Sequence, residues 1–241
     1  MITGKFHSME SMGLVDGPGI RTVVFLQGCA LRCAYCHNPD TWNLSEGKEI
    51  TPKELVDKLL RFKTYFVKSG GGVTFSGGDP LLQPDFLLET LKLCKQKGID
   101  TAIDTAGHGF GEYDEILKYT DLVLLDVKHI EKDDYNKLTG QGNDKFLEFT
   151  KALNKSTAKV WIRHVVVPGI TDSKEHILKL GEFIKNNIQK VEKIELLPYH
   201  TLGIDKYKKL GIEYKLKDLP PMDKNLCKEL QKLIDPFANK N

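Results

Sequence analysis

Six short runs of apolar, often β-branched residues recur along the chain, and they restrict its fold more than any other feature. Most are continuously apolar, which is typical of parallel strands that are covered by helices. The runs are 22–27, 72–76, 101–104, 122–127, 160–167 and 193–198. A chain of 241 residues suits one α/β domain of this kind, and we expect a single domain over residues 1–241.

Helical patterns separate most of the runs. Thr51 and Pro52 suit the N-cap and first position of a helix that continues to about residue 68. Pro84 begins a second helix, which Gly98 ends. Further helices are expected over 112–119, 145–154, 173–187 and 222–234, with Asp172 or Ser173 as a cap. Strands that alternate with helices indicate a βα series.

Right-handed crossovers would coil this series into a parallel sheet or barrel. A complete barrel has eight strands, so six predict a partial (β/α)6 barrel of parallel strands with a lateral opening. An open doubly wound sheet is the alternative. Both folds place chemistry at the C-terminal ends of the strands, where the motifs of this sequence fall.

Three cysteines follow the first run with the spacing C-x3-C-x2-C: Cys29, Cys33 and Cys36. Three thiolates on one loop can bind three irons of a [4Fe–4S] cluster and leave the fourth iron for a substrate, whereas fully ligated clusters use four cysteines. A structural zinc site completed by His37 or His7 is the alternative, although no second ligand pair follows. Cys94 and Cys227 have no nearby ligand partner and are expected to be buried.

The overall composition excludes several classes of protein. A net charge of +2 gives no reason to expect a nucleic-acid or acidic-membrane partner. No apolar run approaches the roughly 20 residues of a membrane span, and residues 1–10 lack a secretory signal pattern. Five cysteines, three of them clustered, argue against a disulfide framework. We therefore expect a cytoplasmic protein.

Several motifs resemble one family closely and occur in the same order over nearly the whole chain. The segment GCALRCAYCHN at 28–38 resembles the radical S-adenosylmethionine signature. The other segments are VDGPGIR at 15–21, NPDTW at 38–42, GGGVTFSGG at 70–78, WIRHVVVPG at 161–169 and ELLPYH at 195–200. Together they resemble the pyruvate formate-lyase activating enzymes, which would make the chain a single radical S-adenosylmethionine domain.

The resemblance implies a reaction and its participants. A [4Fe–4S] cluster would cleave S-adenosylmethionine reductively, and the 5′-deoxyadenosyl radical would take a hydrogen atom from a backbone glycine of pyruvate formate-lyase. A flavodoxin- or ferredoxin-type protein would supply the electron. Activators of other glycyl-radical enzymes, including that of anaerobic ribonucleotide reductase, remain alternatives within this class. A zinc-binding protein without catalysis is the alternative from another class.

The resemblance also implies roles for individual residues. Cofactor contacts are expected at Tyr35, Cys36, His37, Gly77, Gly78, Asp126, Val127, Lys128 and His200, and also at Asp79, where the family usually has Glu. Asp104, Thr105 and Asp126 are expected to hold a monovalent cation. Asp16 and Arg163 are assigned to the opening that receives the substrate loop.

Structural readings compete with several of these roles. Tyr35 could be ordinary core packing, and Asp79 with Pro80 is a good N-cap and first helical pair. Asp126 and Lys128 lie on the same side of a strand and could form a local ion pair. Arg163 could meet a carboxylate or face solvent, and residues 16–19 would form a rigid turn in any case.

Overall fold

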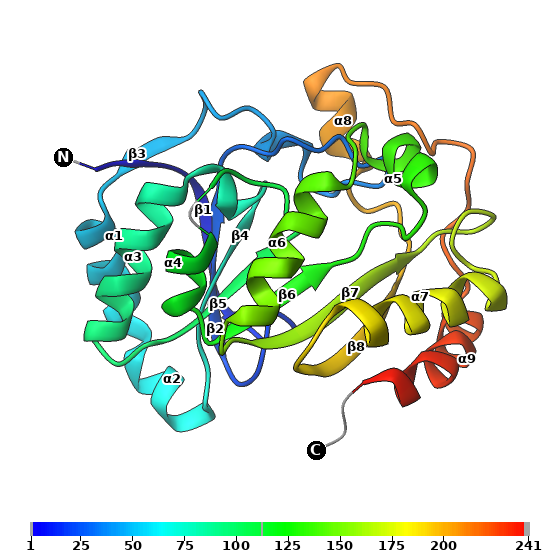
Figure 1. The fold of residues 1–241 in the computed structure, drawn as a ribbon. Helices are drawn as coiled ribbons and strands as arrows, with labels where there is room; N and C mark the ends of the chain where they lie inside the picture. Colours follow the sequence, from blue (N-terminus) through cyan, green and yellow to red (C-terminus); the bar gives the residue numbers. More distant parts are fainter. Residues whose placement is uncertain (1, 112, 239–241) are drawn as a thin grey trace.

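A computed structural model describes residues 2–111 and 113–238 of the chain. Its centre is an eight-stranded sheet with the strand order β3-β1-β2-β4-β5-β6-β7-β8. Figure 1 shows helices packed along this sheet, with the chain running from blue at the N-terminus to red at the C-terminus. None of the helices in the described part is long and apolar enough to cross a bilayer.

Six neighbouring strands are parallel, as the apolar runs predict. Each strand is hydrogen-bonded to the next one in chain order, so every connection returns the chain to the start of the neighbouring strand. They are β2 (Arg21–Leu26), β4 (Gly72–Gly77), β5 (Asp100–Thr105), β6 (Leu122–Asp126), β7 (Lys159–Val166) and β8 (Val191–Pro198). The expected runs agree with these bounds to within two residues at each end.

Two strands at one edge were not expected from the sequence. β1 (Gly4–Gly13) pairs antiparallel with β2, and β3 (Lys48–Ile50) pairs antiparallel with β1. β1 mixes polar and apolar residues and changes register twice, with Met12 at a φ of 68°. An irregular strand without a continuous apolar face gives little hydrophobic pattern to detect.

Most helices confirm the sequence pattern. Thr51 and Glu54 form a capping box at the start of α1, in which each side chain bonds the backbone of the other. The helices are α1 (Pro52–Leu59), α2 (Lys63–Ser69), α3 (Pro84–Gln96), α4 (Tyr113–Lys118), α6 (Asp144–Lys155), α7 (Lys174–Asn187) and α9 (Lys224–Ile234). The expected start of the fourth helix, residue 112, lies outside the described residues. α5 (Lys132–Thr139) and α8 (Ile204–Leu210) were not predicted, because each is short and rich in charge.

The sheet remains open because its two edge strands, β3 and β8, are not bonded to each other. The large apolar core lies between the sheet and its helices, where Ile103, Val123 and Ile162 contribute from three strands. Ala102, Leu122 and Leu124 form a separate small cluster with Trp161 on the opposite face. One face thus carries the helices and the other faces inward, which confirms a partial barrel and not a doubly wound sheet.

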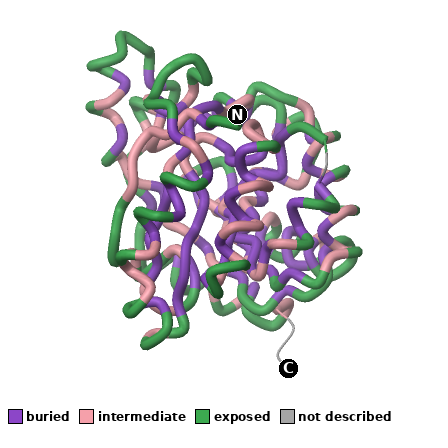
Figure 2. Tube along the Cα trace, turned by 90° about the vertical axis from the view of Figure 1, so that its left-hand side faces the viewer, coloured by how far each residue is buried: buried purple, intermediate pink, exposed green. Residues whose placement is uncertain are grey.

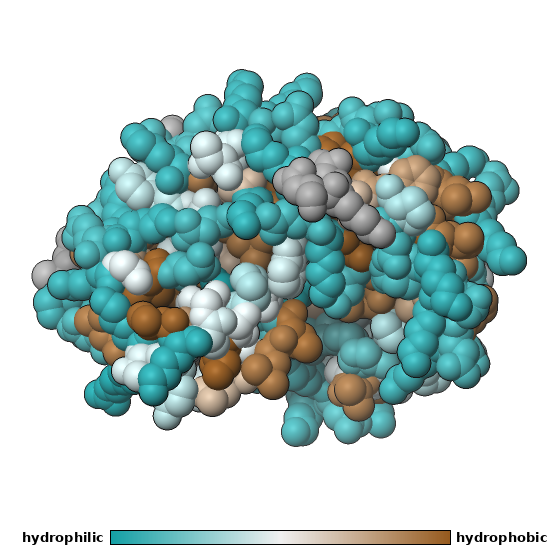
Figure 3. Space-filling model, turned by 90° about the horizontal axis from the view of Figure 1, so that it is seen from below, coloured by the Kyte–Doolittle hydropathy of each residue, from teal (hydrophilic) through white to brown (hydrophobic). Residues whose placement is uncertain are grey.

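The burial pattern separates this interior from the surface. In Figure 2 the purple, buried segments run through the middle of the molecule, with green, exposed segments around them. Seen from below, the surface in Figure 3 is mainly hydrophilic, with apolar side chains in small groups between. Arg21 is an exception in the interior: it is fully buried, and its guanidinium lies 2.9 Å from the carboxylate of Asp100.

Candidate active site

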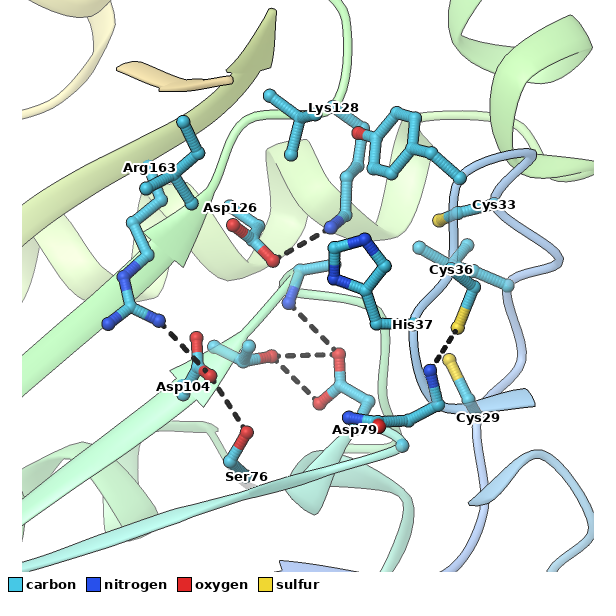
Figure 4. A pocket seen from close by; sticks show the side chains of 18 of the residues that line it. Cys29, Cys33, Cys36, His37, Ser76, Asp79, Asp104, Asp126, Lys128 and Arg163 are labelled. Atoms are coloured by element: carbon cyan, nitrogen blue, oxygen red, sulfur yellow. Dashed lines mark hydrogen bonds and ion pairs between the residues drawn. The ribbon is translucent and has the colours of Figure 1, made fainter. Parts of the chain in front are cut away.

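A cavity of about 380 Å³ opens at the C-terminal ends of the parallel strands. All six strands, or the residues directly after them, contribute to its wall, which Figure 4 shows from close by. Of the expected site residues it is lined by Cys29, Cys33, Tyr35, Cys36, His37, Gly77, Gly78, Asp79, Asp104, Thr105, Asp126, Lys128, Arg163 and His200. The structure therefore brings these residues together at the C-terminal ends of the strands.

The cysteine loop is held from both sides by backbone hydrogen bonds. Arg32 and Ala34 donate to the last carbonyls of α5 at 2.7 and 2.9 Å, and Gly28 donates to Thr41 at 2.7 Å. Burial raises the pKa of the Cys33 thiol to about 11 and raises the pKa of Cys29 and Cys36 as well. Because only thiolates bind metal, metal binding at this loop releases protons.

The three thiols fit a cluster better than a single zinc ion. Within residues 2–111 and 113–238, no three His, Cys, Asp or Glu side chains come close enough together to hold one metal ion. A cubane instead spreads its thiolates over different irons. His37, a candidate zinc ligand, is stacked on His200, and His7 pairs with Asp40 at 3.2 Å. Cys94 and Cys227 are buried in the core, in α3 and α9.

Gly77 and Gly78 let the end of β4 lie directly against β2 and the cysteine loop. Gly77 has a φ of 116°, and a side chain on it would collide with the backbone of Leu26. A side chain on Gly78 would collide with the carbonyl of Gly28. Both glycines line the cavity, so the close approach they allow joins two walls of the site.

Asp79 is a helix cap as well as a wall residue. Its carboxylate accepts hydrogen bonds from the backbone N–H of Leu81 and Ala106 and from the hydroxyl of Thr105 at 2.7 Å. It caps the short helix Pro80–Leu82, as the Asp-Pro pair suggested. Burial raises the pKa of Asp79 to about 6. Four short contacts already occupy this carboxylate, whose side chain is one methylene shorter than Glu.

Arg163 meets carboxylates and does not face solvent. Its guanidinium lies 3.4 Å from Asp104 and 3.7 Å from Asp16, and it donates to the carbonyl of Val15 at 2.6 Å. Asp104 also accepts from the hydroxyl of Ser76 at 2.7 Å. Burial lowers the pKa of Arg163, but the neighbouring carboxylates outweigh it and raise the pKa overall. The arginine therefore links two strand ends to the turn at 16–19.

Asp126 and Lys128 form the expected ion pair, with 2.7 Å between Oδ2 and Nζ, and both line the cavity. Burial opposes the charge of Lys128, but Asp126 outweighs it and raises the pKa of Lys128 well above the usual value. The ammonium also lies 5.6 Å from the ring centre of Tyr35. Val127 is not among the lining residues, since its side chain is buried in the core.

His37 and His200 form one side of the cavity from opposite ends of the parallel sheet. Their rings are stacked, with centroids 3.9 Å apart at 21°. Burial lowers the pKa of both imidazoles. The loop after β2 and the loop after β8 thus meet here, which brings the first and last parallel strands into one site.

The hydrogen-bond donors, positive charges and imidazole rings that line the cavity are the groups that bind a ligand with both an anionic and an aromatic part. Tyr35 Oη and Arg163 Nε are buried and have no hydrogen-bond partner in the described part of the chain. Lys128 and Arg163 supply positive charge, and the two imidazoles offer flat faces. A cofactor with a carboxylate and a purine matches this set of groups.

Some lining residues were missed in the sequence. Ser76 and Val165 lie two residues from positions that were considered, and the period of two within a strand could have identified them. The contribution of α8 could not be foreseen in this way. Tyr207 donates to the carbonyl of Cys36 at 3.0 Å, and Lys206 reaches Asn38 and Asp40 across the sequence.

Comparison with known proteins agrees with this site. The model of the Radical SAM superfamily matches residues 23–181, which include the three cysteines. The chain therefore belongs to the radical S-adenosylmethionine superfamily, and this membership implies a [4Fe–4S] cluster and S-adenosylmethionine as its cofactors.

Relatives of high sequence identity show which family within the superfamily the chain belongs to. A pyruvate formate-lyase-activating enzyme from Clostridium pasteurianum is 65% identical over 97% of this chain and 98% of its own length. One from Staphylococcus epidermidis is 50% identical over 98% and 96%. Within the superfamily, the chain belongs to the pyruvate formate-lyase-activating enzymes.

Solved structures agree in fold. A domain of pyruvate-formate lyase-activating enzyme from Bacteroides vulgatus matches with a TM-score of 0.56 at 25% identity, covering 70% of this chain and 95% of that one. Streptococcus suis SuiB bound to its precursor peptide SuiA matches with a TM-score of 0.65 at 21% identity, over 88% and 45% of the two chains. The latter likeness supports the fold alone.

Proposed function

We propose that this protein activates pyruvate formate-lyase by removing a hydrogen atom from one of its backbone glycines. The observation that carries the proposal is the convergence of Cys29, Cys33 and Cys36 on a charged cavity at the strand ends, in a chain 65% identical to a named activating enzyme. When bound, the cluster and S-adenosylmethionine supply an electron and, by cleavage of a C–S bond, the 5′-deoxyadenosyl radical that accepts the hydrogen atom.

The residues of the chain bind and orient in this proposal. The three cysteines hold the cluster, Lys128 and Arg163 balance negative charge, and the stacked His37 and His200 offer a surface for the adenine. Gly77 and Gly78 leave room beside the cysteine loop, and Tyr35 contributes its unpartnered hydroxyl. Asp79 acts here chiefly by connecting the loops after β4 and β5, because its carboxylate already accepts hydrogen bonds from Leu81, Thr105 and Ala106.

The substrate loop is proposed to enter beside the turn at 16–19. Arg163, which lines the cavity, contacts both Asp104 and this turn, and this contact supports a place for the turn near the opening. A glycine suits such a target, since a loop that lacks a Cβ at one position can approach the reacting atoms closely.

A label-transfer experiment tests this function. With the enzyme reduced and pyruvate formate-lyase present, deuterium on the α-carbon of the substrate glycine should appear in 5′-deoxyadenosine. Asp16→Ala should impair this transfer more than it impairs cofactor binding. Unlabelled 5′-deoxyadenosine with full-length partner present would overturn the assignment, and transfer only with a different glycyl-radical enzyme would point to another activase. A colourless protein that binds zinc and no iron would favour the non-catalytic alternative.

We propose in addition that Asp104, Thr105 and Asp126 hold a monovalent cation. The two carboxylates end neighbouring strands and line the same cavity, where burial raises the pKa of Asp104. Arg163 and Lys128 compete for these carboxylates, and the Thr105 hydroxyl bonds Asp79, so a cation would have to share them. Cofactor affinity that is equal in potassium and in tetramethylammonium salts of the same ionic strength would contradict this proposal.

A flavodoxin- or ferredoxin-type protein is proposed as the electron donor, and the cytoplasm as the compartment. All five cysteines are free, which suits a reducing environment. A shallow groove beside the cysteine loop, lined by Arg32, Trp42, Leu44 and Leu210, offers a surface near the cluster. Reduction of the cluster by purified donors, followed by its absorbance, tests which of them is competent.

A further inference from the structure

The segment that follows β6 alternates between two environments. Asp126 and Lys128 point into the cavity, as Figure 4 shows. On the other side of the same segment, His129 lies with His164 of β7 and with His176 from the first turn of α7. The ring of His176 lies 4.8 Å from that of His129 and 5.2 Å from that of His164. His129 and His164 are buried, and neither lines the cavity.

The hydrogen bonds of this group determine which ring nitrogens carry protons. His164 Nδ1 lies 2.7 Å from the carbonyl oxygen of Val127, and because a carbonyl only accepts, this nitrogen must donate. In the neutral ring of His164, Nε2 then carries no hydrogen, and it accepts a hydrogen bond from Nε2–H of His176 at 3.2 Å. Burial lowers the pKa of His164 to about 3 and of His176 to about 4, so both rings are neutral near pH 7.

The hydrogen bonds from His176 to His164 end at the carbonyl of Val127, which lies beyond the last residue of β6. β6 ends at Asp126, whose ladder partner is Arg163. The N–H of Val127 still donates to Arg163 at 2.9 Å, but its carbonyl accepts from the His164 side chain. Further on, the N–H of Glu131 donates to His129 Nδ1 at 3.1 Å. Two histidines thus fix the backbone on either side of Lys128.

We propose that His164, supported by His176, is a positioning residue of the cofactor cavity: it holds the Val127 carbonyl and thereby sets the direction of Asp126 and Lys128. This inference rests on the proposed function. A metal-binding role for the three histidines is not favoured, because no three ligand side chains in the described ranges are grouped for one ion.

Two substitutions of His164 test the contribution of each ring nitrogen separately. His164→Asn keeps an N–H at the position of Nδ1 and can still bond Val127, whereas His164→Gln keeps a polar group only at the position of Nε2. His176→Phe keeps a ring but removes the donor to His164. The three variants and the wild type are compared as cluster-loaded, full-length proteins without oxygen. The readouts are calorimetric affinity for S-adenosylmethionine, the paramagnetic resonance spectrum of the reduced cluster, and iron content.

We expect His164→Gln to weaken S-adenosylmethionine binding about tenfold with full iron content, the usual scale for a hydrogen bond to a buried carbonyl. His164→Asn should stay within about threefold of the wild type, and His176→Phe should fall between the two. The spectrum with cofactor should change in His164→Gln and not in His164→Asn.

Equal affinity of the Asn and Gln variants would overturn the positioning role. If neither His164 variant folds, an unchanged affinity and spectrum in His176→Phe would overturn it as well. Absence of cofactor binding in the wild type itself would instead count against the proposed function.

Discussion

At the scale of single residues, burial governs the chemistry of the cavity. It raises the pKa of the three thiols of the cysteine loop and of Asp79, so the site without metal favours neutral groups. The positive charges that remain, on Lys128 and Arg163, are each paired with a carboxylate. A metal cluster that demands thiolates must therefore supply the free energy of their deprotonation when it binds.

The cysteines give the most direct test at this scale. Cys33→Ser should abolish cluster binding, because one iron loses its thiolate, whereas Cys94→Ser and Cys227→Ser should retain full iron content. Iron and absorbance are measured after anaerobic reconstitution. The two control thiols are buried in helices away from the loop, so their loss affects packing only. Full iron content in Cys33→Ser would contradict the cluster assignment.

The histidine pair predicts a pH dependence of stability. The pKa of His164 is lowered from 6.5 to about 3 by burial, so between these values the unfolded chain binds more protons than the folded one. The stabilisation is complete above pH 6.5 and is lost as the pH falls. Between pH 6.5 and 5 the wild type should lose about 2 kcal/mol of unfolding free energy through this group.

Urea unfolding of the metal-free proteins at pH 7 and pH 5 measures this loss. His164→Asn should show a smaller loss than the wild type, since an amide does not titrate in this range. The titratable and charged groups around His164 and His176 are the same in both proteins: His129, Asp126, Asp134, Asp172 and Lys179. Burial also lowers the pKa of His176, to about 4, so His176 contributes a loss of its own in both proteins. An equal loss in the two proteins would show that the ring is not neutral in the folded state.

At the scale of secondary-structure elements, what the sequence predicts depends on how the element is stabilised. Four of the parallel strands, β2, β4, β5 and β6, are buried on both faces, so each appears as an apolar run. β7 and β8 are buried mainly on one face, and their apolar residues were still sufficient to predict them. α8 is different, because its position depends on contacts with a loop 166 to 171 residues earlier in the chain. Tyr207 bonds Cys36 and packs edge-on against Trp42, with ring centroids 5.8 Å apart. No local pattern reports such contacts.

The same limit applies to the site. The cysteines and glycines could be predicted because their spacing repeats a family motif. Asp79, by contrast, follows the same motif, but its carboxylate already accepts hydrogen bonds from three donors, which only the folded geometry reveals. For Asp126 and Lys128 the structure shows the ion pair and places both side chains in the wall of the cavity, and their contact with the cofactor stays a prediction.

α8 is expected to slow the loss of the cluster. Tyr207→Phe removes the hydrogen bond to the Cys36 carbonyl, worth about 1 kcal/mol, and should speed cluster loss about fivefold. The rate is followed by the decay of cluster absorbance in the presence of a chelator. Tyr65→Phe, at an exposed position on α2, is the matched control and should decay like the wild type. Equal rates in all three proteins would exclude this role of α8.

At the scale of the whole molecule, the two ends of the barrel interior differ. One end is the open cavity, and the other is closed by Arg21, whose guanidinium bonds Asp100, the Val73 carbonyl and the Thr74 hydroxyl. Thr74 in turn donates to the carbonyl of Asp16, in the turn at 16–19. We propose that residues 1–241 unfold as one domain, because these bonds join the first parallel strand to the next two.

Arg21→Met should therefore destabilise the entire chain by about 3 kcal/mol, because the Val73 carbonyl and the Thr74 hydroxyl lose a buried donor and the half-exposed Asp100 loses its charge partner. Lys53→Met removes an exposed pair with Asp57, which solvent screens, and should leave the stability unchanged within experimental error. Urea unfolding followed by fluorescence and by circular dichroism measures both. Two separate transitions in the wild type would contradict a single domain.

The contact between α8 and the cysteine loop also has a consequence for biosynthesis. The loop ends at Cys36, whereas Tyr207, which covers its backbone, is added 171 residues later. At the usual speed of translation this interval lasts about 10–30 s. Throughout it the three thiols have emerged without the helix that later packs against their loop. Delivery of iron and sulfide to the nascent chain meets a more accessible loop than delivery to the finished protein.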